Sequence, residues 1–408
     1  MPASTFDVAV IGGGAAGFFG ALCVAEANPN CSIVILEKTT KLLAKVKISG
    51  GGRCNVTHAC FEPTPLARHY PRGSKELKTL FRHFQAKDVV DWFAGKGVAL
   101  KIEADGRMFP ATNQSQTIID CFLAEAERLG IQIRMQSEVT RLHAAAGGWQ
   151  LTLTNGNITA RHVLVATGGY PRPDSYDWLR PWQPVIAPVP SLFTFNDSKM
   201  LFRDLMGVAV AQAEIKIAGT SFSETGPVLI THWGLSGPAV IKLSAWAARW
   251  LRDQDYTFTA LVNWSGTQGE EALRQDLRDR NVHHGRQRIA GHPLHQIPVR
   301  LWERLCTLAE IDNQRTWAEL PRKNLNRLVE YVIRCPFEIR GKTTFKEEFV
   351  TCGGIDLASI DLTTMQSKTH QGIYFAGEVL NIDGETGGFN FQAAWTTAWL
   401  AARAIARN

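Results

Sequence analysis

A glycine-rich turn near the N-terminus constrains this chain most. Residues 8–25 read VAVIGGGAAGFFGALCVA, and Gly12, Gly14 and Gly17 form the pattern GxGxxG between a short apolar run and an apolar helical stretch. There, the first glycine permits a tight turn, the second lets a pyrophosphate approach the backbone, and the third packs the helix on the strand. The free N–H groups of the helix N-terminus favour phosphate. The segment therefore predicts a dinucleotide-binding unit.

An acidic residue supports this interpretation. The segment CSIVILEK (31–38) has the composition of a second buried strand, and Glu37 near its end follows Gly17 by 20 residues. An acid at this point of a βαβ unit binds the ribose hydroxyls of a dinucleotide. The alternative is a glycine-rich turn that holds no ligand, and the position of the acid argues against it.

The apolar N-terminal run also invites a different interpretation, as a signal peptide or membrane span. The preceding MPASTFD lacks the basic residues of a signal peptide and includes Asp7. Three consecutive glycines are also poor for the centre of a membrane helix. We expect strand, turn and helix instead, and a protein that does not enter a membrane.

Bulk properties narrow the class of protein. The length of 408 residues predicts two or three domains. The net charge of +6 suits an anionic cofactor but is too mild to indicate a nucleic-acid protein. The eight cysteines contain no CxxC pair and no spacing typical of a disulfide framework. We therefore expect a cytoplasmic enzyme.

The pattern of apolar, polar and glycine residues changes along the chain. A glycine-rich α/β pattern extends to about residue 185 and returns from about residue 340, whereas strand-like runs fill 185–265 and polar helical sequence fills 266–330. The simplest organisation is one nucleotide-binding domain, built from both ends of the chain, with a β and helical insertion. The clearest expected elements are strands within 6–11, 31–38, 131–167, 208–219, 256–264 and 372–380, and helices at 76–96, 113–129 and 391–407. Residues 39–75 are expected to be irregular.

The C-terminal segment favours FAD over NAD. Residues 372–395, GIYFAGEVLNIDGETGGFNFQAAW, predict a strand, a turn at Gly377 and Glu378, and a second glycine turn that leads into a helix. Two-part FAD sites use such an element, because the helix N-terminus stabilises negative charge on the reduced flavin. NAD dehydrogenases need no such late element. The alternative is a glycine-rich loop before a surface helix.

Further motifs occur in a fixed order: SGGGRCN (49–55), GRMFP (106–110), ATGG (166–169), THWGLSGPA (231–239), TMQSK (364–368) and YFAGEVLNIDGETGGFNFQ (374–392). Together they resemble the BaiN-like family of FAD-dependent oxidoreductases, and the matches run from residue 8 to residue 405. The resemblance implies an α/β fold, namely a Rossmann-like FAD-binding domain with an inserted β-barrel and a small helical subdomain. The implied boundaries are 1–187 and 341–408 for the FAD-binding domain, 188–265 and 327–340 for the barrel, and 266–326 for the helical subdomain.

The resemblance also implies a set of cofactor-binding residues. The pyrophosphate would face Gly12, Gly14, Ala15, Ala16 and Gly17, and the adenosine ribose would meet Glu37 and Lys38. The phosphate and ribityl path would be lined by Lys45, Gly51, Gly52 and Arg53, and adenine would meet the backbone of Val139. Glu378 and the backbone of Asn390 and Phe391 would meet the ribityl chain and isoalloxazine. The set is completed by Cys54, Asn55, Ala166, Thr167, Gly168, Gly377 and Gly388.

One loop departs from the family pattern. After ATGG the family has a serine two residues on and then a Gly- and Ser-rich loop, whereas this chain reads YPRPDSYDW (170–178). We expect this loop near the mouth of the active site. The departure therefore weakens any inference of the substrate from relatives.

Several residues admit two interpretations. Cys54 is either a redox thiol or, in our preferred interpretation, a small residue that fills space beside the cofactor. His232, Tyr170 and Tyr176 are either proton donors or structural residues, and no catalytic residue is assigned. The cluster of His283, His284, His292 and His295 fits no zinc spacing, so a polar surface is expected in place of a metal site. The nearby basic residues, either RNA contacts or a solvated face, are Arg274, Arg278, Arg280, Arg286 and Arg288.

We therefore predict an FAD-dependent oxidoreductase that performs two-electron chemistry. The family resemblance implies reduction of a conjugated C=C bond or a ketone in a small organic substrate. NAD(P)H is a candidate transient donor, because no second GxGxxG provides a nicotinamide domain. Nucleic acid and membrane are not the expected partners. The alternatives are an RNA-modifying flavoprotein and a non-catalytic flavin-binding or sensor protein.

Overall fold

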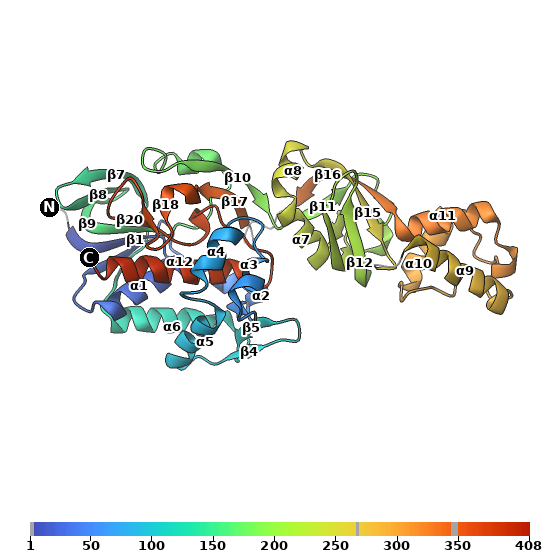
Figure 1. Ribbon diagram of the computed structural model, residues 1–408, viewed down its shortest axis with the longest axis horizontal. Helices are drawn as coiled ribbons and strands as arrows, with labels where there is room; N and C mark the ends of the chain where they lie inside the picture. The colour runs from blue at the N-terminus through green and yellow to red at the C-terminus, as the bar shows by residue number, and fades with distance from the viewer. Residues whose placement is uncertain (1–3, 267–268, 344–349) are drawn as a thin grey trace. The chain divides into compact units, whose positions relative to one another are not determined.

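The computed structural model describes residues 4–266, 269–343 and 350–408 (Figure 1). The chain divides into two compact units, a first unit of residues 1–191 and 346–408 and a second unit of residues 192–345. The division lies a few residues from the expected domain boundaries at 187/188 and 340/341. Barrel and helical insert form one unit in this division, so their separation at residues 266 and 326 stays a prediction.

A parallel sheet forms the centre of the first unit. Its strands follow the order β20-β9-β1-β2-β6, and each neighbouring pair is parallel. The apolar runs expected as buried strands form this sheet, and every residue of β2 is buried, as sheets covered on both faces require. The strand bounds are β1 (Ser4–Ile11), β2 (Ile33–Leu36), β6 (Gln132–Arg134), β9 (Gly156–Val165) and β20 (Ile373–Phe375).

Antiparallel strands extend this sheet and form two smaller ones. The hairpin of β7 (Val139–Ala145) and β8 (Gly148–Leu153) pairs with β9, and β18 (Ile360–Asp361) and β19 (Gln366–Ser367) continue from β20. The smaller sheets contain β3 (Thr57–His58), β5 (Arg107–Pro110) and β4 (Leu100–Ile102) in one case, and β10 (Val185–Ser191) with β17 (Val350–Ile355) in the other.

Helix α1 (Ala15–Ala27) explains the apolar N-terminal run. Ten of its 13 residues are buried, and it packs along α12 (Phe389–Ile405), the closing helix. Phe19 of α1 lies edge-on to Trp395 of α12, with ring centroids 5.3 Å apart. A helix that is apolar on all sides belongs in a protein core or a membrane, and here the core surrounds it. Across the described ranges, the helices are too short or too polar to span a bilayer.

Residues 39–75 are more ordered than expected, because short helices and the short strand β3 occupy them. The other helices of the first unit are α2 (Ala44–Gly52), α3 (Pro63–Ala67), α4 (Ser74–Leu80), α5 (Ala86–Gly95) and α6 (Ser115–Arg128), with short 3-10 turns η1 (Pro173–Tyr176), η4 (Leu357–Ser359) and η5 (Gly377–Val379). The expected helices at 76–96 and 113–129 are present, the first of them split into α4 and α5.

The second unit contains a closed barrel and a group of helices. The barrel order is β11-β14-β13-β12-β15-β16, and closure pairs β11 with β16. The fold class expected from the sequence, an α/β protein with an inserted barrel and a helical part, is thus confirmed. The bounds are β11 (Thr194–Asp197), β12 (Ala209–Ile217), β13 (Ser223–Ile230), β14 (Gly234–Ser236), β15 (Thr257–Asn263), β16 (Cys335–Thr343), α7 (Pro238–Trp246), α8 (Ala248–Asp253), α9 (Glu270–His284), α10 (Val299–Leu308) and α11 (Arg322–Ile333), with 3-10 turns η2 (Arg203–Leu205) and η3 (Trp317–Glu319).

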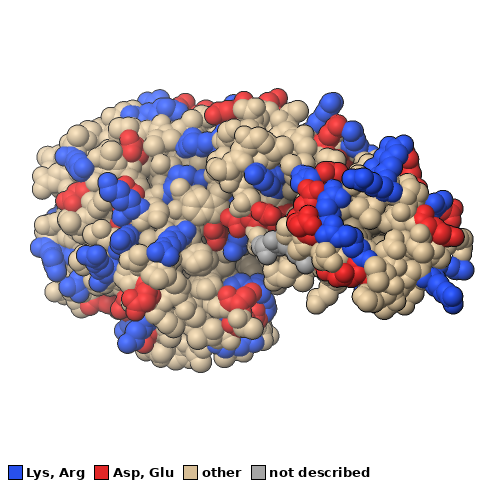
Figure 2. All heavy atoms as spheres, turned by 45° about the vertical axis from the view of Figure 1, so that its right-hand side comes forward, with Lys and Arg blue, Asp and Glu red and all other residues tan. Residues whose placement is uncertain are grey.

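Basic and acidic side chains are mixed over the visible surface (Figure 2). This distribution matches the mild net charge of the whole chain. An anion-binding surface on this protein would therefore depend on a local excess of arginine and lysine in particular elements.

Candidate cofactor site

The carboxyl ends of four parallel strands meet at one edge of the main sheet. They carry Gly12 after β1, Glu37 after β2, Ala166 after β9 and Gly377 two residues after β20. Backbone hydrogen bonds join these ends, since the Gly12 N–H donates to the Leu36 carbonyl at 2.8 Å. The Ala166 N–H donates to the Ile11 carbonyl, also at 2.8 Å. Ligands of open α/β sheets bind at this edge, so the predicted residues gather where a nucleotide is expected.

The three motif glycines play different parts in the turn. Gly12 has φ +115°, and a Cβ there would lie 2.4 Å from the Ala166 carbonyl oxygen. A Cβ at Gly17 would lie 2.0 Å from the Gly12 carbonyl oxygen. A Cβ at Gly14 would meet no atom within 4 Å. Packing therefore demands the first and third glycines, whereas Gly14 borders open space.

That open space fits a pyrophosphate. Gly14 is the N-cap of α1 and makes no side-chain bond to the first-turn amides. Unbonded amides at the positive end of a helix are donors for an anion. Ala15 and Ala16 follow in the first turn, and neither side chain can bond these amides. The residues present at this position therefore fit the phosphates of a dinucleotide.

Glu37 is held beside the turn. Its carboxylate accepts the Gly13 N–H at 2.9 Å and the Thr39 N–H at 2.8 Å. A carboxylate has about four acceptor positions, so these two bonds orient the group and leave capacity for ribose hydroxyls. Lys38 lies beside it, with its ammonium 5.3 Å from the centroid of the Tyr170 ring.

The predicted adenine contact is close to Glu37 through the backbone. The Ser137 N–H donates to the Glu37 carbonyl at 2.9 Å, which places the start of β7, and so Val139, next to the end of β2. The Val139 side chain is 7% exposed. The contact of the Val139 backbone to adenine stays a prediction.

The SGGG segment interrupts helix α2. Ser49 has extended backbone angles, and Gly50, Gly51 and Gly52 have φ of +59°, +69° and +82°. A Cβ at Gly51 or Gly52 would meet no atom within 4 Å, whereas one at Gly50 would lie 2.8 Å from the Phe109 ring. At positions 51 and 52, glycine is thus required by the positive φ angles and not by close neighbours. The backbone at these two positions borders open space.

Arg53 follows this turn and points to the β4–β5 hairpin. Its Nη1 donates to Glu103 Oε1 at 2.5 Å, and its guanidinium lies 3.9 Å from the centroid of the Phe109 ring. Glu103 therefore neutralises part of the charge that the sequence suggested for a cofactor phosphate. The role of Arg53 toward a cofactor stays a prediction.

Cys54 is fully covered by protein. Burial raises the pKa of its thiol to about 12, so the group is neutral at physiological pH. A redox or nucleophilic cysteine needs an accessible thiolate. The structure thus supports the space-filling interpretation of this residue.

Lys45 and Glu378 join the two halves of the candidate site. Lys45 Nζ donates to Glu378 Oε2 at 2.5 Å, and Glu378 Oε1 accepts the Thr351 N–H at 2.9 Å. Glu378 belongs to η5, which begins at Gly377, where φ is +76°. Both residues belong to the set predicted to meet the ribityl part of the cofactor, and that role stays a prediction.

The N-terminus of α12 is fixed by its surroundings. Gly388, its N-cap, has φ +93°, and a Cβ there would lie 2.6 Å from the Thr57 carbonyl carbon. Asn55 is oriented to accept the Gly388 N–H at 3.0 Å. Asn390 bonds Gly384 twice, since its Oδ1 accepts the Gly384 N–H at 2.8 Å and its Nδ2 donates to the Gly384 carbonyl at 3.0 Å. Phe391 stacks on Trp395.

The loop that departs from the family pattern is packed by its own tyrosines. Tyr170 and Tyr176 meet edge to face with centroids 4.9 Å apart, and the Tyr176 hydroxyl accepts the Tyr170 N–H at 3.2 Å. Burial raises the pKa of Tyr176 to about 12. Tyr176 is fully buried, which supports its structural interpretation over a role as proton donor. Before this loop, Thr167 and Gly168 continue from β9, and φ of Gly168 is +73°.

Sequence reasoning missed a group of side chains around the NIDGETGG loop. Buried Asp383 forms a bidentate ion pair with Arg72, and Ser191 Oγ donates to Asp383 Oδ2 at 2.9 Å. The His69 ring stacks on Phe389 with centroids 4.1 Å apart, and its Nδ1 lies 3.1 Å from Glu385 Oε2. Arg72 and His69 come from residues 39–75, where the sequence carried no motif that could have indicated them.

The remaining sequence candidates belong to the second unit. His232 is exposed and lies edge-on to Trp233, with centroids 4.2 Å apart. His283 and His284 end α9 on the surface, His292 Nδ1 is 2.9 Å from the Arg288 carbonyl, and His295 pairs with Asp276. Within residues 4–266, 269–343 and 350–408, no three His, Cys, Asp or Glu side chains form a group suited to a metal ion.

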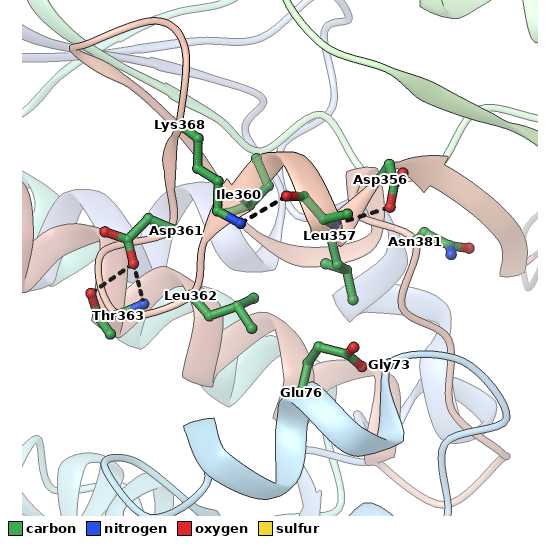
Figure 3. A pocket seen from close by; sticks show the side chains of 11 residues that line it. Gly73, Glu76, Asp356, Leu357, Ile360, Asp361, Leu362, Thr363, Lys368 and Asn381 are labelled. Carbon is green, nitrogen blue, oxygen red and sulfur yellow. Dashed lines mark hydrogen bonds between the residues drawn. The ribbon is translucent and has the colours of Figure 1, made fainter.

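A cavity of about 560 Å³ lies elsewhere in the first unit (Figure 3). It is lined by η4, β18 and the start of α4, and it includes three carboxylates, Glu76, Asp356 and Asp361. Lys368 from the TMQSK motif donates to the Ala358 carbonyl at 2.8 Å. Because the lining is acidic, this cavity does not suit a pyrophosphate.

Comparisons with known proteins agree with a nucleotide-binding site at the carboxyl edge of the main sheet. The sequence model described as "HI0933-like protein Rossmann domain" matches residues 6–404. The chain is 28% identical to the ribosomal RNA dihydrouridine synthase of Escherichia coli (strain K12), with 98% of this chain and 97% of the relative covered. It is 26% identical to the protein of the same name in Haemophilus influenzae, with 98% of both covered. It is 24% identical to the 3-dehydro-bile acid delta(4,6)-reductase of Clostridium scindens, with 98% of both covered.

Solved structures show the same fold. A flavocytochrome c3 fumarate reductase in its open conformation matches with a TM-score of 0.52 and 17% identity, over 100% of this chain and 79% of that one. The 3-ketosteroid-delta4-(5alpha)-dehydrogenase of Rhodococcus jostii RHA1 matches with a TM-score of 0.52 and 13% identity, over 99% and 97%. The family expected from the sequence motifs is confirmed. This chain belongs to the HI0933-like family of Rossmann-fold, FAD-binding oxidoreductases.

Proposed function

We propose that this protein reduces a carbon–carbon double bond conjugated to a carbonyl group, and that its substrate is uridine in ribosomal RNA. The observation that carries the proposal is the pair of whole-length relatives named ribosomal RNA dihydrouridine synthase, at 28% and 26% identity. Dihydrouridine is uridine whose C5=C6 bond, conjugated to the C4 carbonyl, has gained two hydrogens. The reaction class expected from the sequence therefore contains this reaction.

A small conjugated ketone is the second candidate. The relative named 3-dehydro-bile acid delta(4,6)-reductase matches over the same length at 24% identity. Its name describes a ring system in which the double bonds are conjugated to a ketone. Both candidates share one chemical step. The expectation from the sequence that nucleic acid is not a partner is consistent with this second candidate and not with the first.

FAD, when bound, supplies the hydride for this step. The residues of this chain hold and orient the cofactor in our proposal. Gly12, Gly14 and the first turn of α1 receive the pyrophosphate, because Gly14 borders open space and the α1 amides are uncapped. Glu37 receives the ribose hydroxyls, and the positive end of α12 favours negative charge on the reduced flavin. The remaining predicted contacts are Lys38, Lys45, Gly51, Gly52, Arg53, Asn55, Val139, Ala166, Thr167, Gly168, Gly377, Glu378, Gly388, Asn390 and Phe391.

NAD(P)H is the proposed source of electrons. The net reaction adds one hydride and one proton across the double bond, and it oxidises NAD(P)H to NAD(P)⁺. The sequence holds a single GxGxxG motif, which the FAD turn uses. We therefore propose that the nicotinamide visits the cofactor site transiently and leaves before the substrate is reduced.

The test uses the purified protein with FAD, under anaerobic conditions, and both NADH and NADPH. Ribosomal RNA from cells that lack this protein is the first substrate, and a 3-oxo-Δ4 steroid is the second. Mass spectrometry of RNA nucleosides would detect a gain of about 2 Da at uridine, the mass of two hydrogens. We expect dihydrouridine to form. Reduction of the steroid with unchanged RNA would overturn the RNA substrate and favour the second candidate.

A further inference from the structure

Helices α9 and α11 of the second unit form a basic groove. The groove encloses about 740 Å³. Its lining contains four arginines and one carboxylate, so arginine is locally in excess although the whole chain is only mildly basic. The lining residues are Arg274, Arg278, Arg322, Leu325, Asn326, Arg327 and Glu330.

Two of the guanidinium groups are fixed on α9. Arg274 Nε donates to Glu270 Oε1 and its Nη1 donates to Asn326 Oδ1, both at 2.8 Å. Arg278 Nη2 donates to Glu271 Oε1 at 2.7 Å. A guanidinium has five N–H donors, so these bonds orient each group and leave further donors for a ligand. The arginines are thus positioned before any ligand arrives.

Arg322 brings a less compensated charge to the groove. It is the first residue of α11 and is exposed. Among the residues that the structure describes, it makes no ion pair. Lys323 follows it and is also exposed. The groove therefore combines oriented arginines with a cation that has no carboxylate partner among the residues described.

We propose that this groove binds the phosphodiester backbone of the RNA substrate and that α9 and α11 form an RNA-docking surface. This inference rests on the proposed function for the class of substrate. Guanidinium groups bind phosphate through two parallel N–H donors, and contacts of this kind position an RNA without reading its sequence. The surface would hold the RNA while another part of the protein acts on the base.

The arrangement suits a polymer with closely spaced anionic groups, and the relatives named ribosomal RNA dihydrouridine synthase favour RNA over an acidic protein segment. Arg274 and Arg278 are four residues apart on one helix, so their Cβ atoms are about 5–6 Å apart and both face the same side. A chain with a charge on every residue can meet both, together with Arg322 from the facing helix.

The test compares two double variants with equal loss of charge. R278A/R322A removes two arginines from the groove, and R286A/R288A removes two exposed arginines that do not line it. The probe is a fluorescein-labelled ribosomal RNA stem-loop of about 30 nucleotides, read by fluorescence anisotropy at several salt concentrations. We expect R278A/R322A to weaken binding about 10-fold and to reduce the salt slope by about 1–2, since each lost phosphate contact lowers it by about 1. R286A/R288A should bind as the wild type does.

Folding and reaction are measured separately. Circular dichroism and flavin absorbance check that each variant keeps its fold and cofactor, and R278K/R322K tests whether paired donors matter beyond charge. Equal weakening by both alanine double variants, or by neither, would overturn the groove as the binding site. Equal competition by polyglutamate would also overturn it. If the wild type forms dihydrouridine while the groove variants bind RNA normally, the groove inference fails and the proposed function stands. If the wild type neither binds nor modifies RNA, both fail.

Discussion

Lys45 and Glu378 lie 333 residues apart in the chain, yet their side chains meet at 2.5 Å between Nζ and Oε2. Lys45 is near the start of α2, and Glu378 lies in η5, so the bond closes the first unit across its two chain segments. The Lys45 side chain is 47% exposed, whereas that of Glu378 is 16% exposed. Glu378 also accepts the Thr351 N–H at 2.9 Å. Removal of the Glu378 carboxylate should therefore cost more folding stability than removal of the Lys45 ammonium group.

A double-mutant cycle on this pair should measure the difference. We expect Glu378→Ala to lower the free energy of unfolding by about 1–2 kcal/mol, because the Thr351 amide loses its acceptor as well. Lys45→Ala should cost less than about 1 kcal/mol, since the lysine is half exposed. The coupling energy between the two should be about 0.5 kcal/mol and should fall in 1 M NaCl. Urea unfolding of the apoprotein measures the stability of the wild type, the two single variants and the double variant.

The matched control for this cycle is Lys41→Ala, which removes an exposed lysine from the preceding loop. We expect Lys41→Ala to change stability by less than about 0.5 kcal/mol and to show no coupling to Glu378→Ala. A coupling energy of zero between Lys45 and Glu378 would mean that the short contact contributes nothing to stability.

The two glycines of the nucleotide turn should respond in opposite ways to alanine. Gly14→Ala places a Cβ in open space, so we expect the apoprotein to keep its stability while the dissociation constant for FAD rises at least about 10-fold. Gly12→Ala places a Cβ 2.4 Å from the Ala166 carbonyl at φ +115°, so we expect a loss of at least about 2 kcal/mol of stability.

Quenching of flavin fluorescence gives the affinity for FAD, and urea unfolding gives the stability of both glycine variants. The two variants control for each other, because each adds one methyl group to the same turn. Wild-type FAD affinity of Gly14→Ala would show that no phosphate lies beside this glycine and would remove the main support for the proposed pyrophosphate position.

The parts of the fold that local patterns specify were predictable. A strand, GxGxxG and a helix form one local unit, and an acid near the end of the next strand must lie beside it, because parallel strands end at the same edge. The closing helix was predictable as well, because its apolar residues continue over 17 positions between Phe389 and Ile405. These inferences depend only on contacts between residues close in sequence or on the known rules of parallel sheets.

The parts that depend on distant partners were not predictable. Arg72 meets Asp383 across 311 residues, and nothing in the sequence around Arg72 marks it as the partner of a buried carboxylate. The glycines at 50–52 suggested a cofactor loop, but not that it would interrupt a helix or that Arg53 would turn to Glu103. Tertiary contacts decide such orientations, and a single sequence does not record them.

Cys54 should be inert toward alkylating reagents in the folded protein. With the pKa of its thiol raised to about 12 by burial, about one thiol in ten thousand is ionised at pH 8, and that group is covered. Cys60 is partly exposed and serves as the internal control. Iodoacetamide at pH 8 followed by peptide mass mapping should show modification of Cys60 at least about 10-fold faster, and Cys54 should react only after unfolding in urea. Rapid labelling of Cys54 in the native state would contradict its space-filling role and would favour the alternative interpretation as a reactive thiol.

Glu125 should give the stability of the first unit a dependence on acid pH. The bond from Arg128 at 2.7 Å and the bond from Lys96 at 2.9 Å lower the pKa of this carboxyl to about 2, from an ordinary value of 4.5. A lowered pKa stabilises the folded state above about pH 4.5, and this contribution is lost as the pH falls from 4.5 towards 2. The Glu125 side chain is 16% exposed, but its partner Arg128 is 55% exposed, so we expect Glu125→Gln to cost only about 0.5–1 kcal/mol at pH 7.

The cost of Glu125→Gln should shrink as the pH falls toward 2, because an increasing fraction of the wild-type carboxyl is then protonated as well. Urea unfolding of the apoprotein at pH 7, 5 and 3 measures this trend. Glu127→Gln is the matched control, since it changes an exposed glutamate two residues away on the same helix that makes no ion pair among the described residues. Its effect should be within about 0.5 kcal/mol and independent of pH. Equal effects of the two substitutions at pH 7 would mean that net charge, and not the bonds to Arg128 and Lys96, sets the acid sensitivity.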